Sequence, residues 1–409
     1  MTPLFPPTRT AALARLAAVR PAAYASSRNR LDGAVTGLSP YLTHGLLSLP
    51  EVAASVAARQ ALPVDHKLVQ ELAWREFFHH VWQHRGDGIL ESLHPGPRPD
   101  ADYSPTLPDD IRRARSGVPV IDAAVRTLYA TGWLHNHARM WLASYVVHVR
   151  GVHWRAGADW LVAHLLDGDL ASNHLSWQWI AGTGSHKPYL FNAENVARYS
   201  VGLAGWASPG SVIDTDYATL ERWARGSAAL PPSPAVAGAG LDEPALWQQP
   251  PPDLAPPAAL PARKAVAGRE VWLVHPWSLA DPAPVPRGGR DPLRLGVWPA
   301  EFHGRWPWSA ARWRFVATRL AAISAQVVWA DSAALRQALA GAASVRCTDN
   351  PHLPADWPAA WRQPAPRLLA DPGQLCGSFS QFWRLASRGI TRLGAGAAEP
   401  PAEADLFDA

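Results

Sequence analysis

The stretch from Asp167 to Trp179 holds the densest group of chemically active side chains in the sequence. It reads Asp-Gly-Asp-Leu-Ala-Ser-Asn-His-Leu-Ser-Trp-Gln-Trp, so two carboxylates, a carboxamide and two indoles lie within thirteen positions. The neighbouring residues are apolar and have helical spacing. A carboxylate in apolar surroundings is costly unless it is paired. We therefore expect these acids to face an arginine and the polar edge of a bound ring system.

Two earlier blocks place polar and aromatic side chains on single helix faces. In the block Glu71-Leu72-Ala73-Trp74-Arg75-Glu76-Phe77, three residues share a face through i, i+3 and i+4 spacing, namely Glu71, Trp74 and Arg75. This block alone is also explained by a surface ion pair beside a core tryptophan. In the block from Thr131 to Met140, the residues on one face are Asn136, Arg139 and Met140. Each block therefore predicts a helix with these side chains on one face.

A further block, Thr36-Gly37-Leu38-Ser39-Pro40-Tyr41, has the composition of a helix start. Ser39 is a natural N-cap, and Pro40 suits the first turn. The N-terminus of a helix presents free amides and a positive dipole, which favour an anion such as a phosphate. The block is therefore a candidate phosphate contact.

Taken together and in their order along the chain, the four blocks resemble the FAD-binding domain of the DNA photolyase/cryptochrome family over roughly residues 20 to 205. The resemblance implies that FAD is the cofactor and that it is contacted by Tyr24, Thr36, Leu38, Ser39, Arg75, Asn136, Arg139, Asp167, Asp169 and Asn173. It also implies that Asp167 pairs with Arg139 and that Asp169 accepts a hydrogen bond from the flavin ring or its ribityl arm. Asn173 is implied to face the flavin N5, and a carboxamide suits that place because it both donates and accepts.

The same resemblance implies a deoxyribodipyrimidine photo-lyase, which splits cyclobutane pyrimidine dimers in damaged DNA by electron transfer from excited reduced FAD. Methionine at Met140 is the pattern of enzymes that act on these dimers. The residues implied to hold the dimer are Glu71, Trp74, Asn136, Met140 and Trp179, and those implied to act in catalysis are Trp177, Trp154, Asn173 and Glu71. Two alternatives stay open: a cryptochrome-like blue-light photoreceptor that binds FAD without repairing DNA, and a flavoprotein without a light function.

The tryptophan relay that the family uses to reduce its flavin is only partly present. Trp177 takes the place of the first electron donor, and Trp154 takes that of the middle tryptophan. The third place falls near Ile111, which cannot serve, so the relay is either truncated or diverted through another indole such as Trp141 or Trp160. The segment 185–192, which follows Trp179, also departs from the family pattern.

The expected fold is mostly α, with a C-terminal Rossmann-like α/β domain. Apolar residues at three- and four-residue spacing predict a helical FAD-binding domain over residues 10–225, with helices at 136–149 and 154–166. The proline- and alanine-rich residues 226–268 predict a linker or a loosely held tether. Alternating strand and helix patterns predict a parallel sheet over 269–390, with strands at 271–274, 293–297, 326–329 and 344–347, followed by a disordered tail over 391–409.

The α/β region is interpreted as the antenna domain of the family in a swapped position. Residues 271–282 have the shape of its first strand and turn, and 309–315 resemble the helix after its second strand. The run Phe379-Ser380-Gln381-Phe382-Trp383-Arg384 resembles its closing segment. Neither a Gly-x-Gly-x-x-Gly motif nor a Walker lysine accompanies this region, so nucleotide phosphate binding is not indicated there. The antenna chromophore stays open.

Composition limits the remaining possibilities. The chain has 409 residues, a net charge of +4, only two cysteines and no apolar run long enough to span a membrane. The first residues lack the layout of a signal peptide, so a cytoplasmic location is expected. The protein is also expected to be a monomer. The histidines do not show the spacing of a zinc site, and no metal is expected. The expected partner is damaged DNA, not a membrane.

Overall fold

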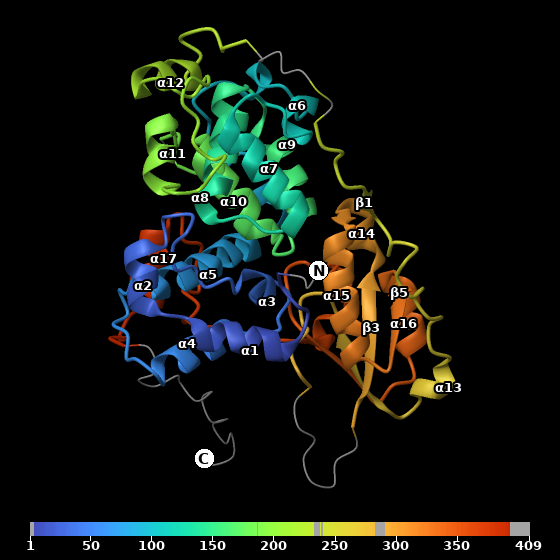
Figure 1. Cartoon of the computed structure of the whole chain (residues 1–409). Helices are drawn as coiled ribbons and strands as arrows, with labels where there is room; N and C mark the ends of the chain where they lie inside the picture. Colours follow the sequence, from blue (N-terminus) through green and yellow to red (C-terminus); the bar gives the residue numbers. More distant parts are fainter. Residues whose placement is uncertain (1–3, 186, 233–237, 239, 283–290, 393–409) are drawn as a thin grey trace.

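The computed structural model describes residues 4–185, 187–232, 238, 240–282 and 291–392. Figure 1 shows three parts: an N-terminal group of helices in blue, a second group of helices in green, and a sheet domain in orange. One continuous core of buried apolar side chains joins the first group to the sheet domain, and a second core fills the green group. The site predicted from the sequence lies where these parts meet.

The first group consists of five helices with recognisable ends. They are α1 (Arg9–Ala18), α2 (Pro21–Ser27), α3 (Ser39–Thr43), α4 (Leu49–Ala57) and α5 (Lys67–Arg85). Ser48 and Glu51 form a complete capping box at the start of α4. In α3 the N-cap is Leu38, and Ser39 is the first helical residue. The expectation that Ser39 caps this helix is therefore wrong by one position.

The second group begins after two short 3-10 turns, η1 (Gly86–Leu90) and η2 (Asp100–Asp102). Its elements are α6 (Asp109–Arg112), α7 (Pro119–Thr131), α8 (Asn136–Ser144), the π-helical turn η3 (Tyr145–Val149), α9 (Trp154–His164), α10 (Leu170–Ala181), α11 (Ala193–Tyr199) and α12 (Tyr217–Ala224). Pro119 opens α7, and Gly132 ends it with a positive φ of 67°. The helices expected at 136–149 and 154–166 are confirmed, the first as α8 plus η3 and the second as α9.

The sheet domain contains five parallel strands in the order β5-β3-β2-β6-β7. Their bounds are β2 (Glu270–Val274), β3 (Leu293–Pro299), β5 (Gln326–Ala330), β6 (Ser344–Thr348) and β7 (Arg362–Gln363). The helices α14 (Ala300–Arg305), α15 (Ala310–Ile323) and α16 (Ser332–Leu339) connect them, and a 3-10 turn, η4 (Ala359–Trp361), precedes β7. Counted along the chain this is the 3-2-1-4-5 order of a doubly wound sheet. The four expected strands are present, and β7 was not anticipated.

The segment 226–268 is more ordered than its composition suggests. Its residues Leu246–Trp247 form β1, which pairs antiparallel with β4 (Trp308–Ser309), and a short helix, α13 (Arg263–Val266), follows. The Leu241 amide donates to the Arg113 carbonyl, and the Glu243 carboxylate accepts from Trp160 and His164. The interpretation as a loose tether is therefore wrong for these residues, whereas 233–237 and 239 lie outside the described part.

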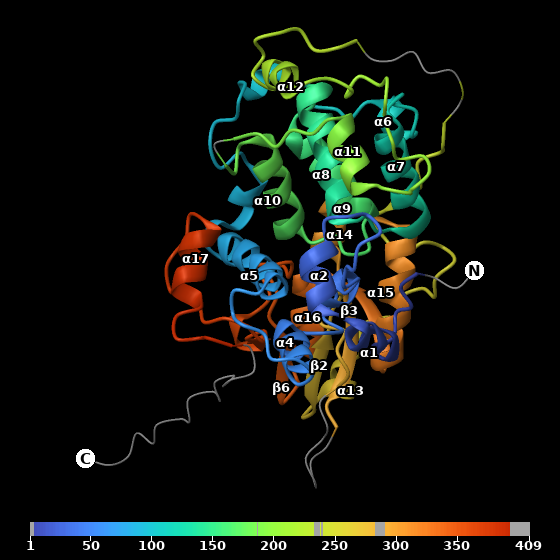
Figure 2. The same ribbon diagram turned by 60° about the vertical axis from the view of Figure 1, so that its left-hand side comes forward.

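The chain does not finish on the sheet. Residues 364–392, here called the C-terminal strap, cross to the first group of helices, and α17 (Phe379–Ala386) packs beside α5 (Figure 2). Near its end the Val64 amide donates to the Thr391 carbonyl. The expectation that residues up to 390 close the α/β domain is therefore wrong. Most of the expected tail, 393–409, lies outside the described residues.

Within the described residues, none of the helices is both long enough and apolar enough to cross a membrane.

Candidate functional site

The loop between α9 and α10 places Asp167 against Arg139. The Arg139 guanidinium donates to Asp167 Oδ2 at 2.8 Å, and the carboxylate is only 2% exposed. This confirms the ion pair expected from the sequence. The other oxygen, Asp167 Oδ1, is buried and has no hydrogen-bond partner among the described residues. A buried acceptor without a donor is costly, so this atom indicates a place for a ligand N–H or O–H.

Asp169 has a different environment, because protein groups occupy both of its oxygens. Oδ1 caps α10 by accepting from the Ser172 amide at 2.8 Å. Oδ2 accepts from His79 Nε2 at 2.8 Å and from the Arg75 guanidinium at 3.3 Å. Burial alone would raise the pKa of this carboxyl, but His79 and Arg75 hold it well below its ordinary value. Asp167, rather than Asp169, therefore has an acceptor left for a ligand donor.

Asn173, Trp177 and Trp154 lie on the adjoining helices α9 and α10. The Asn173 carboxamide donates to the Ala158 carbonyl at 2.9 Å. Both indoles are buried, and Trp154 Nε1 donates to Ser92 Oγ at 3.0 Å. Gly157 gives Trp177 its space, since a Cβ there would lie 2.3 Å from a ring carbon.

The structure also shows where the positions considered for the outer end of the relay lie. Ile111 and Trp141 are fully buried, and Trp160 donates its Nε1–H to Glu243. The ring of His174 lies 6.3 Å from that of Trp154 and 5.5 Å from that of Trp306 (centroid distances). Trp306 was not considered from the sequence, because it belongs to the other domain.

The predicted substrate-facing residues are spread over α5, α8 and α10. Glu71 is 43% exposed and lies 3.5 Å from Arg28. Asn136 is exposed, and its amide lies 3.4 Å from the Met140 sulfur. Trp179 is 42% exposed and packs near Tyr189. Trp74 is half-buried, and one face of its indole is stacked on Phe379.

Three of the predicted phosphate contacts, Thr36, Leu38 and Ser39, lie at the start of α3. Thr36 Oγ1 accepts from the Leu38 amide at 3.4 Å, and Ser39 Oγ accepts from Trp133 Nε1 at 3.1 Å. Tyr24 lies beside Arg28 on the preceding helix, and burial raises the pKa of its hydroxyl. Both hydroxyls of this turn keep a proton to donate, because here they act as acceptors.

Arg312 is a site residue that sequence reasoning missed. It comes from α15, is 1% exposed, and donates to the backbone carbonyls of Val162 and Gly168, on either side of Asp167. Its guanidinium also lies 4.0 Å from the centroid of the Trp308 ring. Burial lowers its pKa to about 9, although Asp167 and Asp169 act in the opposite direction. No local pattern signals this residue, since arginine is rarely buried.

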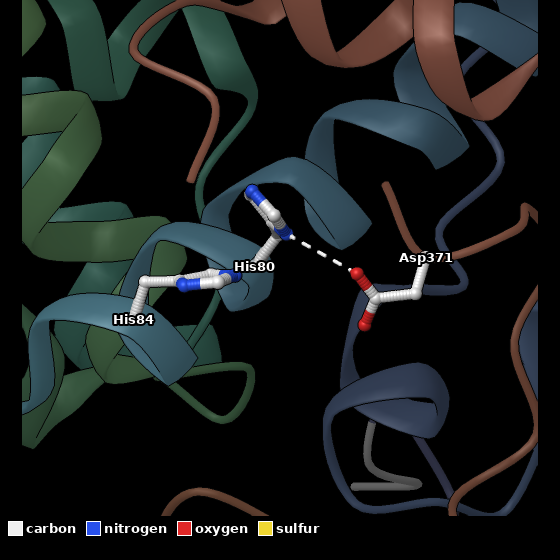
Figure 3. Close-up of side chains that lie close together, drawn as sticks. All are labelled: His80, His84 and Asp371. Carbon is white, nitrogen blue, oxygen red and sulfur yellow. Dashed lines mark ion pairs between the residues drawn. The ribbon is translucent and has the colours of Figure 1, made fainter. Parts of the chain in front are cut away.

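His80, His84 and Asp371 form a cluster with ligand atoms close enough to hold a metal ion (Figure 3). His80 Nε2 accepts from the Cys376 amide at 3.0 Å, so a neutral ring keeps its proton on Nδ1. Nδ1 is the atom that faces Asp371, at 4.0 Å. A metal would need a lone pair on that atom. His80 Nδ1 therefore carries a proton when the ring is neutral, and in that state it has no lone pair for a metal ion. The expectation of no metal site stays a prediction.

A cavity of about 740 Å³ lies between the sheet domain and the first helices. It is lined by residues that follow β2, such as Trp277 and Ser278, by residues that end or follow β6, such as Thr348 and Asn350, and by Arg75 of α5. The strands β2 and β6 are neighbours at the point where the strand order reverses. In doubly wound sheets, ligands bind in the crevice at this point.

Comparisons with known proteins match part of this chain. Residues 68–202 match the family model described as the FAD binding domain of DNA photolyase. Over this stretch the chain is similar to proteins of the DNA photolyase/cryptochrome family. The matched part of the chain includes α5 and α7 to α10, which together present Arg75, Arg139 and Asp167. FAD is its cofactor.

Curated relatives are similar in sequence to this chain over part of their length. A deoxyribodipyrimidine photo-lyase of Thermus thermophilus is 40% identical over 202 residues, which cover 47% of each chain. That of Streptomyces griseus is 38% identical over 166 residues, which cover 40% of this chain and 35% of the relative. The chain thus spans about a third to a half of the length of the curated relatives it matches.

Solved structures of the family also align in part. A Synechocystis cryptochrome is 29% identical with a TM-score of 0.42, covering 47% of this chain and 43% of its own. An archaeal photolyase from Sulfolobus tokodaii, described with two FAD molecules, is 26% identical with a TM-score of 0.42, covering 56% of this chain and 53% of its own.

Proposed function

We propose that this protein uses FAD and light to split cyclobutane pyrimidine dimers in DNA. The observation that most supports a flavin at this place is Asp167. Its carboxylate is fixed by Arg139 through one oxygen, while the other is buried without a donor among the described residues. It lies on the loop between the helices that present Trp154 and Trp177. An N–H of a bound flavin ring fits this acceptor.

The residues that would hold FAD fall into two groups. Asp167, Arg139, Asn173 and Asn136 would hold the ring, and Tyr24, Thr36, Leu38 and Ser39 would hold the phosphates. Arg75 and Asp169 form an ion pair with one another, so we assign them to the protein structure that supports Asp167. When bound, FAD supplies an electron donor that light can excite. The protein fixes its orientation and excludes water around it.

The proposed substrate face consists of Glu71, Trp74, Asn136, Met140 and Trp179. Photolyases flip their target nucleotides out of the base stack, because the reacting atoms cannot be reached inside the duplex. Exposed Trp179 and half-buried Trp74 offer surfaces for base stacking, and Glu71 offers an acceptor. Arginines around the mouth would bind phosphates, so affinity is expected to fall as salt rises.

Two further assignments complete the proposal. The sheet domain is proposed to be the relocated antenna domain of the family, and the cavity beside Trp277 and Thr348 to be its chromophore site; both rest on the strand order and on the cavity at its reversal point. The relay from Trp177 and Trp154 is proposed to continue to Trp306 through the space occupied by His174. A monomer and a cytoplasmic location remain predictions.

A photoreceptor that binds FAD without repair is the second candidate. One observation favours it: the segment 185–192 differs from the pattern of the repair enzymes.

One experiment separates the two functions. The purified protein is illuminated with single-stranded DNA that contains dimers, after its flavin spectrum has been recorded. Loss of dimers is expected, and Glu71→Ala is expected to slow it, whereas Glu194→Ala, at the exposed start of α11, should not. Bound FAD without dimer loss would leave the photoreceptor, and no bound FAD would refute both.

A further inference from the structure

The C-terminal strap is fixed to α5 by hydrogen bonds at three levels of that helix. The amides of Leu368 and Leu369 donate to the Glu76 carboxylate, the second at 2.9 Å. The Cys376 amide donates to His80 Nε2 at 3.0 Å. One turn further on, the Arg367 guanidinium donates to Gln83 Oε1 at 2.5 Å. The strap therefore has a defined register along α5.

That register brings two aromatic side chains of α17 onto α5. Phe382 is buried, and its ring centroid lies 5.7 Å from that of Phe77 and 5.3 Å from that of His80. Phe379, one turn earlier, lies flat on the indole of Trp74, with a centroid distance of 4.0 Å and an interplanar angle of 8°. This contact joins residues from two different parts of the chain.

The environment of Trp74 explains what the contact does. Phe77 meets the indole edge-on at 5.6 Å, and Phe78 is tilted against it at 5.4 Å. Phe379 is the one of these three rings that lies parallel to the indole and so sets its plane. Trp74 remains half-buried rather than buried, and the side chain of Glu71, one turn before it, is 43% exposed. The indole is therefore supported on one face while part of its surface stays accessible.

We propose that Phe379 is a positioning residue that holds the Trp74 indole in the plane needed to stack on a flipped pyrimidine. The inference rests on the proposed function, because it assigns Trp74 to substrate stacking. A side chain already fixed in its bound orientation loses less conformational freedom when the ligand binds. Phe379 thereby makes recognition of damaged DNA depend on a segment about 300 residues from Trp74 in sequence.

The test compares the affinities for dimer-containing and undamaged single-stranded DNA. Phe379→Ala is expected to lower this ratio by about two- to tenfold, the range of an aromatic pair contribution. Phe379→Tyr, which keeps the ring, should restore it. Leu385→Ala, a truncation of a half-buried apolar residue on the same helix, should leave the ratio unchanged, and in all variants the flavin spectrum and the unfolding midpoint are recorded.

A double-mutant cycle distinguishes positioning from a general structural role. If Phe379 acts through Trp74, Phe379→Ala should cause no further loss in a Trp74→Ala background. An equal loss in that background, or an unchanged ratio in the single variant, would overturn the inference. Tighter dimer binding by Phe379→Ala would also overturn it and show that Phe379 blocks the indole. A wild-type protein without dimer preference would refute the proposed function itself.

Discussion

Asp169 and Asp159 offer a test of how burial sets the strength of an ion pair. Each carboxylate accepts from one arginine and one histidine: Asp169 from Arg75 and His79, and Asp159 from Arg155 and His174. They differ in exposure, since the Asp169 side chain is 1% exposed and that of Asp159 is 41% exposed. Replacing each by asparagine removes the charge and keeps nearly the same shape.

The expected cost follows from these contacts. In Asp169→Asn the cap on Ser172 can remain, but two hydrogen bonds to charged or polarised donors are lost or weakened, each contributing about 1.5–3 kcal/mol. Arg75 is left without its carboxylate but keeps some access to water. We expect the free energy of unfolding to fall by roughly 2–4 kcal/mol at pH 7. For Asp159→Asn, where water screens the pair, the expected loss is below about 1 kcal/mol.

Urea unfolding of the two variants and the wild type measures the difference. Because the pKa of Asp169 is held well below its ordinary value, its contribution is present above about pH 4. It is lost as the pH falls towards the pKa of the folded state, so the gap between wild type and Asp169→Asn should narrow in acid. The reasoning is refuted if Asp169→Asn lowers the free energy of unfolding by less than about 1 kcal/mol. It is also refuted if Asp159→Asn lowers the free energy of unfolding by as much as Asp169→Asn does.

Three further predictions concern a buried histidine, a glycine and the relay. Burial lowers the pKa of His148 to about 4, so its contribution to stability is present above about pH 6.5 and falls by about 2 kcal/mol by pH 5. In His148→Gln, whose amide can still donate to Ile180, urea unfolding should show a weaker decline between pH 7 and 5, and an identical decline would contradict this. Gly157→Ala should destabilise the protein by about 1–2 kcal/mol despite better helix propensity, because its Cβ would meet Trp177. In Gly304→Ala the added Cβ would meet nothing within 4 Å, so this substitution should be neutral or stabilising. Equal unfolding midpoints for the two alanine variants would argue against the Trp177 contact. Under blue light and with a thiol reductant, flavin reduction should slow strongly in Trp154→Phe and in Trp306→Phe but not in Trp160→Phe. Slow reduction in Trp160→Phe together with normal reduction in Trp306→Phe would exclude Trp306 from the relay.

The parts of the site that lie within one domain could be predicted from the sequence. The pair of Arg139 and Asp167 belongs to blocks whose helices and intervening loop have regular lengths, so their spacing indicated the contact. The strands were also recognisable, because short β-rich runs alternate with helical ones. The error at Ser39 was one of a single position at a helix start, where assignments commonly differ by one or two residues.

Contacts between the domains could not be predicted in the same way. Arg312, Phe379 and Trp306 all reach the site from positions that no local pattern relates to it. An arginine on a helix is ordinarily exposed, and a phenylalanine on an amphipathic helix is ordinarily assigned to the nearest core. The segment 240–247 was misjudged for a related reason: its composition disfavours a core of its own, but Glu243 binds to side chains that the helical domain provides.

The position of the strap at the end of the chain has a consequence for biosynthesis. Trp74 and Phe77 leave the ribosome roughly 300 residues before Phe379 and Phe382, which cover them. At translation rates of about 5–20 residues per second, the aromatic face of α5 stays uncovered for roughly 15–60 s. During that interval a nascent chain has an exposed apolar surface of the kind that chaperones bind and that promotes aggregation. A chain that stops before residue 379 keeps that surface permanently.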